Sequence, residues 1–162
     1  MGAKRAEEVT SVQITARSDY AVRSALELAA TYPQLMTIDR IVSDQDMPRK
    51  FVEAILSQLR RSGIVQTQRG CAGGYTLTRD PTQIFVGEII RSVDGPLAEV
   101  HGVRPHELEY EGTATHVPEL WVSLRSSMRV VLDTVSLAQL LAGRFPARVR
   151  RFANADDAWL PR

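Results

Sequence analysis

The chain has 162 residues, 44% of them hydrophobic and 24% charged, and its 20 lysines and arginines nearly balance 19 aspartates and glutamates. These values are typical of one globular domain with an appended element and exclude a largely disordered chain, although we expect the polar residues 1–12 to be disordered. No apolar run approaches the roughly 18 residues of a membrane span, and no signal segment is recognisable, so we expect a cytoplasmic protein without a membrane partner.

Three helices are predicted in the first half of the chain. Ser18 is a suitable N-cap for the first helix, which continues to about Thr31. Thr37 caps a short second helix, and Pro48 fits the first position of a third helix, for which Gly63 is the expected left-handed C-cap. Apolar residues on one face of the third helix are expected to point inward: Phe51, Val52, Ile55, Leu56 and Leu59.

A two-stranded hairpin follows the three helices. One strand starts at residues 64–65, residues 69–74 (RGCAGG) form a glycine-rich turn, and residues 75–78 return as the second strand. A further short helix is expected over residues 86–93. This order of elements predicts a mainly α fold with a small β-hairpin wing, a winged helix-turn-helix domain that we assign to residues 13–96.

The remainder of the chain is predicted to form a loop, two helices and a tail. Residues 97–117 are acidic and aperiodic, and we interpret them as a loop of the effector or sensor type. Residues 118–143 begin with a long helix, and Ser136 with Gln139 has capping-box spacing for a short final helix, so we assign this segment to dimerisation. Residues 144–162 form an arginine-rich tail in which no element is predicted.

Basic residues are concentrated where a winged helix would meet DNA. Residues 47–79 carry six basic groups against Glu53 alone, whereas residues 80–121 carry two basic and eight acidic groups. The third helix is expected to enter a major groove, with the hairpin tip at the adjacent backbone or minor groove. Basic residues also keep ordinary amphipathic helices soluble, but an arginine beside three glycines on the turn favours DNA. The residues expected to bind DNA are Thr37, Pro48, Arg49, Lys50, Glu53, Ser57, Arg60, Arg69, Gly70, Gly73 and Gly74.

Three segments of the chain resemble one protein family. They are SDYAVRSALELA (18–29), MPRKFVEAILSQLRRSGIVQTQRGCAGGYTL (47–77) and VGEIIRSVDGPL (86–97). Their residues are similar to those of the bacterial winged-helix regulators that include IscR, NsrR and CymR, and the resemblance continues through the helix that contains Trp121.

This resemblance implies a homodimer whose long C-terminal helices cross and which binds a near-palindromic operator in double-stranded DNA. By position, Arg49 and Lys50 would contact bases or phosphates, and Arg69 would lie in or near the minor groove. Ala54 stands where some relatives carry a polar base-reading residue. The apolar face expected to form the dimer consists of Trp121, Leu124, Met128, Val131 and Leu132.

The chain departs from the iron–sulfur members of this family. Those members hold a cluster through three cysteines between the helix after the hairpin and the dimerisation helix, whereas residues 97–117 contain no cysteine. The spacing of His101, His106 and His116 matches no zinc pattern. We therefore expect no cofactor and no metal site. Cys71, the single cysteine, is a candidate redox residue beside Arg69, although no second cysteine is present to resolve an oxidised thiol and an ordinary turn position is the simpler interpretation.

From these observations we predict a homodimeric, sequence-specific DNA-binding transcriptional regulator that acts as a repressor and responds to a small-molecule or protein effector. The alternative is a cluster-free winged-helix interaction module that responds to a metabolite, a partner enzyme or oxidation of Cys71. An enzyme is not predicted, because the sequence contains no recognisable triad order, phosphate loop or paired carboxylates.

Overall fold

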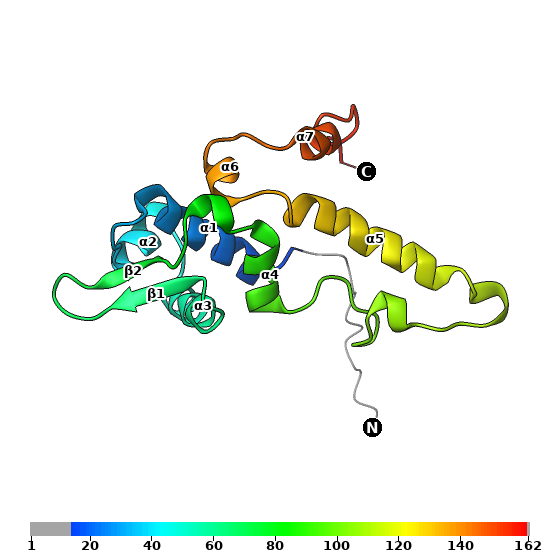
Figure 1. The fold of residues 1–162 in the computed structure, drawn as a ribbon, viewed down its shortest axis with the longest axis horizontal. Helices are drawn as coiled ribbons and strands as arrows, with labels where there is room; N and C mark the ends of the chain where they lie inside the picture. The colour runs from blue at the N-terminus through cyan, green and yellow to red at the C-terminus, as the bar shows by residue number, and fades with distance from the viewer. Residues whose placement is uncertain (1–13, 162) are drawn as a thin grey trace, which may run out of the picture.

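The computed structural model describes residues 14–161, and the disorder expected for residues 1–12 lies outside them. Figure 1 shows a winged domain (residues 14–96) and an arm (residues 97–132) that extends away from it. The helices are α1 (Ala16–Thr31), α2 (Ile38–Gln45), α3 (Arg49–Arg61), α4 (Val86–Asp94), α5 (Val117–Leu132), α6 (Leu137–Leu141) and α7 (Ala147–Ala153). Together with one β-hairpin, they confirm the predicted mainly α fold.

The first two helices begin at threonine caps. The Thr37 hydroxyl accepts from the backbone N–H of Arg40, as the sequence predicts for α2. The prediction for α1 is wrong, because Thr15 and not Ser18 is the N-cap and accepts from the backbone N–H of Ser18. Ser18 is buried, and its hydroxyl donates to the Asp94 carboxylate at 2.5 Å, which ties α1 to α4.

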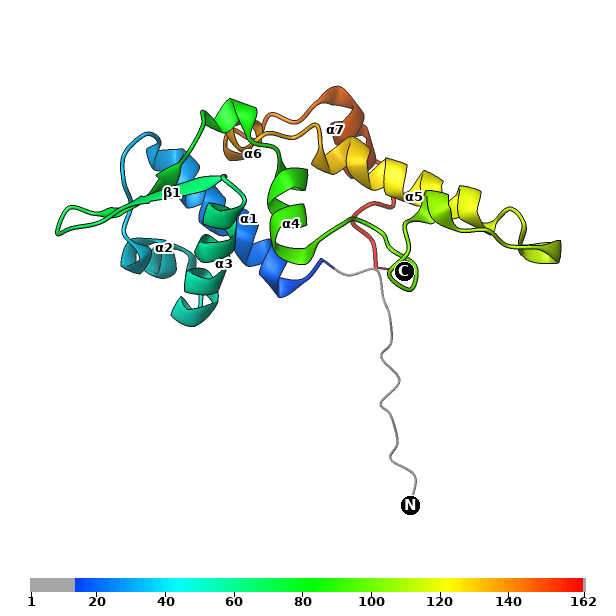
Figure 2. The same cartoon turned by 60° about the horizontal axis from the view of Figure 1, so that its bottom comes forward.

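The wing is an antiparallel hairpin of β1 (Val65–Gln68) and β2 (Gly74–Leu77). Val65 pairs with Leu77, and both side chains are buried. On its other edge β2 pairs with Met36, whose backbone N–H and C=O bond to Tyr75 at 2.9 and 2.8 Å. The base of the wing is therefore held by the segment between α1 and α2, while residues 69–73 project as the tip (Figure 2).

The core of the winged domain is formed by side chains from α1, α3, α4 and the hairpin. Its fully buried residues include Leu28, Leu56 and Leu59. Leu137 of α6 is also fully buried in this core, and its backbone N–H donates to the carbonyl of Ile84 at 2.9 Å. The predicted dimerisation segment 118–143 therefore divides: α5 lies in the arm, whereas α6 packs on the winged domain.

The arm runs outward from α4 as an irregular segment with two short 3-10 turns, η2 (Pro105–Glu107) and η3 (Gly112–Ala114), and returns as α5 (Figure 1). None of the residues of α5 is buried.

Beyond α6 the arginine-rich tail contains α7, which the sequence analysis did not predict. Val149 of α7 is buried in a small cluster with Val86 and Val135, so a long-range apolar contact supports this helix. Across the described residues no helix combines the length and hydropathy that crossing a membrane requires.

Candidate nucleic-acid interface

Helix α3 separates a buried apolar face from an exposed basic one. Val52, Ile55, Leu56 and Leu59 are buried, as expected from their spacing. Outside this stripe, three cations of α3 are exposed and have no ion-pair partner within residues 14–161: Lys50, Arg60 and Arg61. Their charges are available to a polyanion without the loss of an internal ion pair.

Arg49 differs from these cations because it is already paired. Its Nε lies 2.9 Å from Glu53 one turn along α3, and its Nη1 bonds to Asp39 in α2. Arg49 and Glu53, both expected to bind DNA, are therefore ion-pair partners of one another in the structure. A contact of Arg49 with DNA would require its guanidinium to exchange at least one carboxylate for a phosphate or a base edge.

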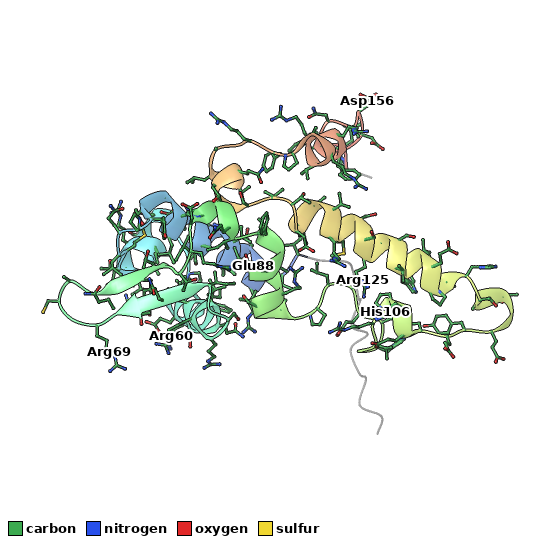
Figure 3. The ribbon with its side chains drawn as sticks, in the orientation of Figure 1. Arg60, Arg69, Glu88, His106, Arg125 and Asp156 are labelled. Atoms are coloured by element: carbon green, nitrogen blue, oxygen red, sulfur yellow. The ribbon has the colours of Figure 1, made fainter. Side chains whose placement is uncertain are left out.

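The tip of the wing places a further cation on the same side of the molecule. Arg69 is exposed, has no ion-pair partner in the described part of the chain, and projects from the tip on the side toward which Arg60 projects from α3 (Figure 3). Two neighbouring elements, α3 and the wing, thus present arginines to one surface. This is the arrangement that a duplex bound by a recognition helix and a wing requires.

The glycines of the turn have local roles. Gly70 has φ +114, a conformation that favours glycine. A Cβ at Gly74 would lie 2.6 Å from the carbonyl oxygen of Met36, so glycine is required there by the backbone pairing of β2. Gly73 is similarly crowded by backbone atoms of the turn. These glycines are expected from the sequence to bind DNA, whereas in the structure the chain's own backbone already accounts for Gly73 and Gly74.

The other predicted DNA-binding residues lie at the starts of helices or on α3. Thr37 and Pro48 are exposed at the N-caps of α2 and α3, where the positive end of the helix dipole favours phosphate. Ser57 is half-buried on α3.

Phe51 is the residue that sequence reasoning misplaced. It was assigned to the inward stripe, but it is 56% exposed and sits beside Lys50, with its ring edge on Tyr20 at a centroid distance of 6.1 Å. A helical wheel places Phe51 at the margin of the apolar stripe, and this marginal position indicates that the side chain can be exposed.

The predicted dimerisation face of α5 is incompletely covered within the chain. Its five residues are all half-buried: Trp121, Leu124, Met128, Val131 and Leu132. The neighbouring Leu120 is 59% exposed. A helix with this much apolar surface and no buried residue retains area that a partner can cover.

The residues present do not fit an iron–sulfur cluster. Cys71 is the single cysteine of the chain, and it is exposed on the tip of the wing, at the opposite end of the molecule from the arm (Figure 1). Within residues 14–161 no three histidines, cysteines or carboxylates converge on a common point. His106 instead lies with its Nδ1 3.1 Å from a guanidinium nitrogen of Arg125.

Comparison with known proteins places this fold among regulators. A family model described as Rrf2, iron-dependent transcriptional regulator, matches residues 14–143. CymR of Bacillus subtilis is 32% identical over 80% of this chain and 89% of its own length. IscR of Aliivibrio salmonicida is 30% identical over 91% of this chain and 88% of its own.

Solved structures give the same result. The structure of CymR, the global cysteine regulator of B. subtilis, matches 82% of this chain and 98% of its own with a TM-score of 0.70 and 30% identity. That of T. potens IscR matches 83% of this chain and 90% of its own with a TM-score of 0.67 and 26% identity. The family and these relatives are transcriptional regulators and not enzymes, which confirms the prediction made from the sequence. The chain belongs to the Rrf2 family of DNA-binding transcriptional regulators.

Proposed function

We propose that the chain is a homodimeric repressor that binds a near-palindromic operator without an iron–sulfur cluster. The observation that carries the dimer is α5: it has 16 residues, projects away from the winged domain, and leaves the five residues of its apolar face only half-buried. A second copy of the chain, related by a two-fold axis, would cover the apolar face of α5 with the same face of its own helix.

Dimerisation supplies the geometry that operator recognition needs. One winged domain reads only one half-site, whereas two recognition helices tied by α5 would enter successive major grooves about 34 Å apart, or a multiple of that distance. Repression follows when such a dimer occupies DNA that the transcription machinery requires. Lys50, Arg60 and Arg69 supply cations that pair with no carboxylate within the described chain.

The dimer is tested by acidic replacement on α5. Leu124→Asp or Met128→Asp would place a charge in the seam, at a cost of several kcal/mol of dimer stability. Ser126→Asp is the matched control, because Ser126 is exposed on the opposite side of the helix. Analytical ultracentrifugation should show a dimer for wild type and Ser126→Asp and a folded monomer for at least one seam variant. A monomeric wild type at micromolar concentration would refute the proposal.

The salt dependence of DNA affinity distinguishes a DNA-binding regulator from the alternative, a winged-helix interaction module. Binding to an operator fragment selected from random duplexes should weaken steeply with salt, because each neutralised phosphate releases a counterion. Lys50→Ala should reduce the slope of log affinity against log salt by about one.

Repressor action is tested in cells with a promoter that contains the selected operator: deletion of the regulator should raise expression from that promoter. A fall in expression would identify an activator instead.

A further inference from the structure

The arm carries a pocket that none of the functions above uses. Its volume is about 490 Å³, which lies within the usual range of small-molecule sites. It is formed where the C-terminal end of α4, the segment after it and α5 meet. The lining residues with charged or titratable side chains are Arg91, Arg104, His106, Arg125, Arg129 and Asp133.

Two of the four arginines are explained by the fold. Arg91 donates to Asp133 at 2.7 Å and Arg129 donates to the same carboxylate at 3.1 Å. Both arginines also lie in the last turn of a helix, Arg91 in α4 and Arg129 in α5, where a cation is favoured by the helix dipole. Asp133 therefore serves both arginines, and its single charge neutralises only one of them.

The other two arginines have no carboxylate partner. Arg125 bonds within the described chain only to Nδ1 of His106 at 3.1 Å. This bond requires a lone pair on Nδ1, so the imidazole accepts it without neutralising the guanidinium. The side chain of Arg104 has no hydrogen-bond or ion-pair partner in residues 14–161. Figure 3 shows His106 and Arg125 facing one another between η2 and α5, well away from Arg60 and Arg69.

We propose that this pocket binds a small oxyanion, a phosphate- or carboxylate-bearing metabolite, through Arg104 and Arg125. Guanidinium groups present planar, two-pronged donors that match these anions, and four arginines against one aspartate leave a positive excess that a ligand of two or more charges would balance. The ligand would contact both the segment that leaves the winged domain and α5. It would thereby act as the effector, a role that rests on the proposed function.

Isothermal titration calorimetry of the full chain without DNA tests the site. The probes are pyrophosphate for the phosphate class and citrate for the carboxylate class, at matched ionic strength. Wild type should bind at least one of them saturably, and Arg104→Gln and Arg125→Gln should each weaken that binding about tenfold or more. Arg125→Lys keeps the charge but loses the planar donor, so its affinity for the probe should lie between those of wild type and Arg125→Gln. Arg151→Gln, an equal charge change on exposed α7, should bind like wild type.

Two results would overturn the binding site. One is the absence of saturable binding by wild type to either probe at millimolar concentration. The other is equal affinity of the pocket variants and Arg151→Gln, which would mean non-specific attraction to a basic surface. Circular dichroism verifies that each variant is folded, as expected for side chains at the rim of an open pocket.

The effector role has its own readout. Operator affinity of wild type should change when the bound probe is added, and this change should disappear in Arg104→Gln. An operator affinity that is the same with and without the probe would overturn the effector role, while the calorimetric result stands. Failure of wild type to bind any operator would instead count against the proposed function, so the two failures are distinguishable.

Discussion

The winged domain and the arm differ in how completely the chain covers their side chains. The winged domain buries leucines from α1 and α3 completely and draws Leu137 from α6 into the same core. The arm contains a helix of 16 residues with none buried and a pocket with more positive than negative charge. The winged domain encloses its apolar core within one chain, whereas the arm leaves apolar and charged surface uncovered, and we propose that a second copy of the chain and an anion bind there.

The largest expected effect contrasts two leucines. Leu56→Ala removes a fully buried side chain and should lower the free energy of unfolding by about 2–5 kcal/mol, by the same amount at low and high protein concentration. Leu124→Ala, the same change on α5, should cost little at low concentration and more as the dimer forms. Urea denaturation at two protein concentrations measures both. A concentration-independent loss at Leu124 equal to that at Leu56 would remove the distinction between the two regions.

A smaller effect is expected for DNA affinity. Arg69→Ala should reduce operator binding by about 1–3 kcal/mol, because it removes an unpaired cation from the tip of the wing. Arg151→Ala on α7, which lies on the side of the molecule away from Arg60 and Arg69 in Figure 3, is the control and should leave affinity unchanged. Fluorescence anisotropy with a labelled operator measures the difference. Equal affinities of wild type and Arg69→Ala would exclude the wing from recognition.

The smallest effect concerns the starts of helices in the two regions. Thr37→Ala removes the side-chain cap of α2 in the winged domain and should cost about 1 kcal/mol of stability. His116 occupies the N-cap of α5 and makes no capping hydrogen bond, so His116→Ala should change stability by only a few tenths of a kcal/mol. Thermal or urea unfolding measures the stability of both variants. Equal losses of stability in Thr37→Ala and His116→Ala would contradict this difference between the two helix starts.

The order of elements could be predicted because it depends on local pattern. Helical spacing, the Thr37 cap and the capping box at Ser136 are all signals within a few residues of the element they define, and the structure contains each of them. The alternation of strand and turn residues likewise located the wing.

What could not be predicted depends on residues far apart in sequence. Ser18 has the residue type of a cap, but its hydroxyl is used by Asp94. Three of the seven residues of α7 are arginines, and Val149 finds its apolar partners only in the folded chain. The acidic stretch 80–121 gave no indication that Arg104 would lie in one pocket with Arg125. Phe51 was misplaced because the margin of a stripe is ambiguous until α1 packs beside it.

The return of the chain to the winged domain through α6 has a consequence for proteolysis. The arm is attached at two points, by α4 before it and by Leu137 after it, so it is an excursion from the domain and not a free tail. A single cut in the irregular segment before α5 would leave both fragments joined through the buried contacts of Leu137 and the backbone pairing of Phe85 with Ser136. A nicked chain should therefore migrate as one particle under native conditions and as two fragments in denaturant.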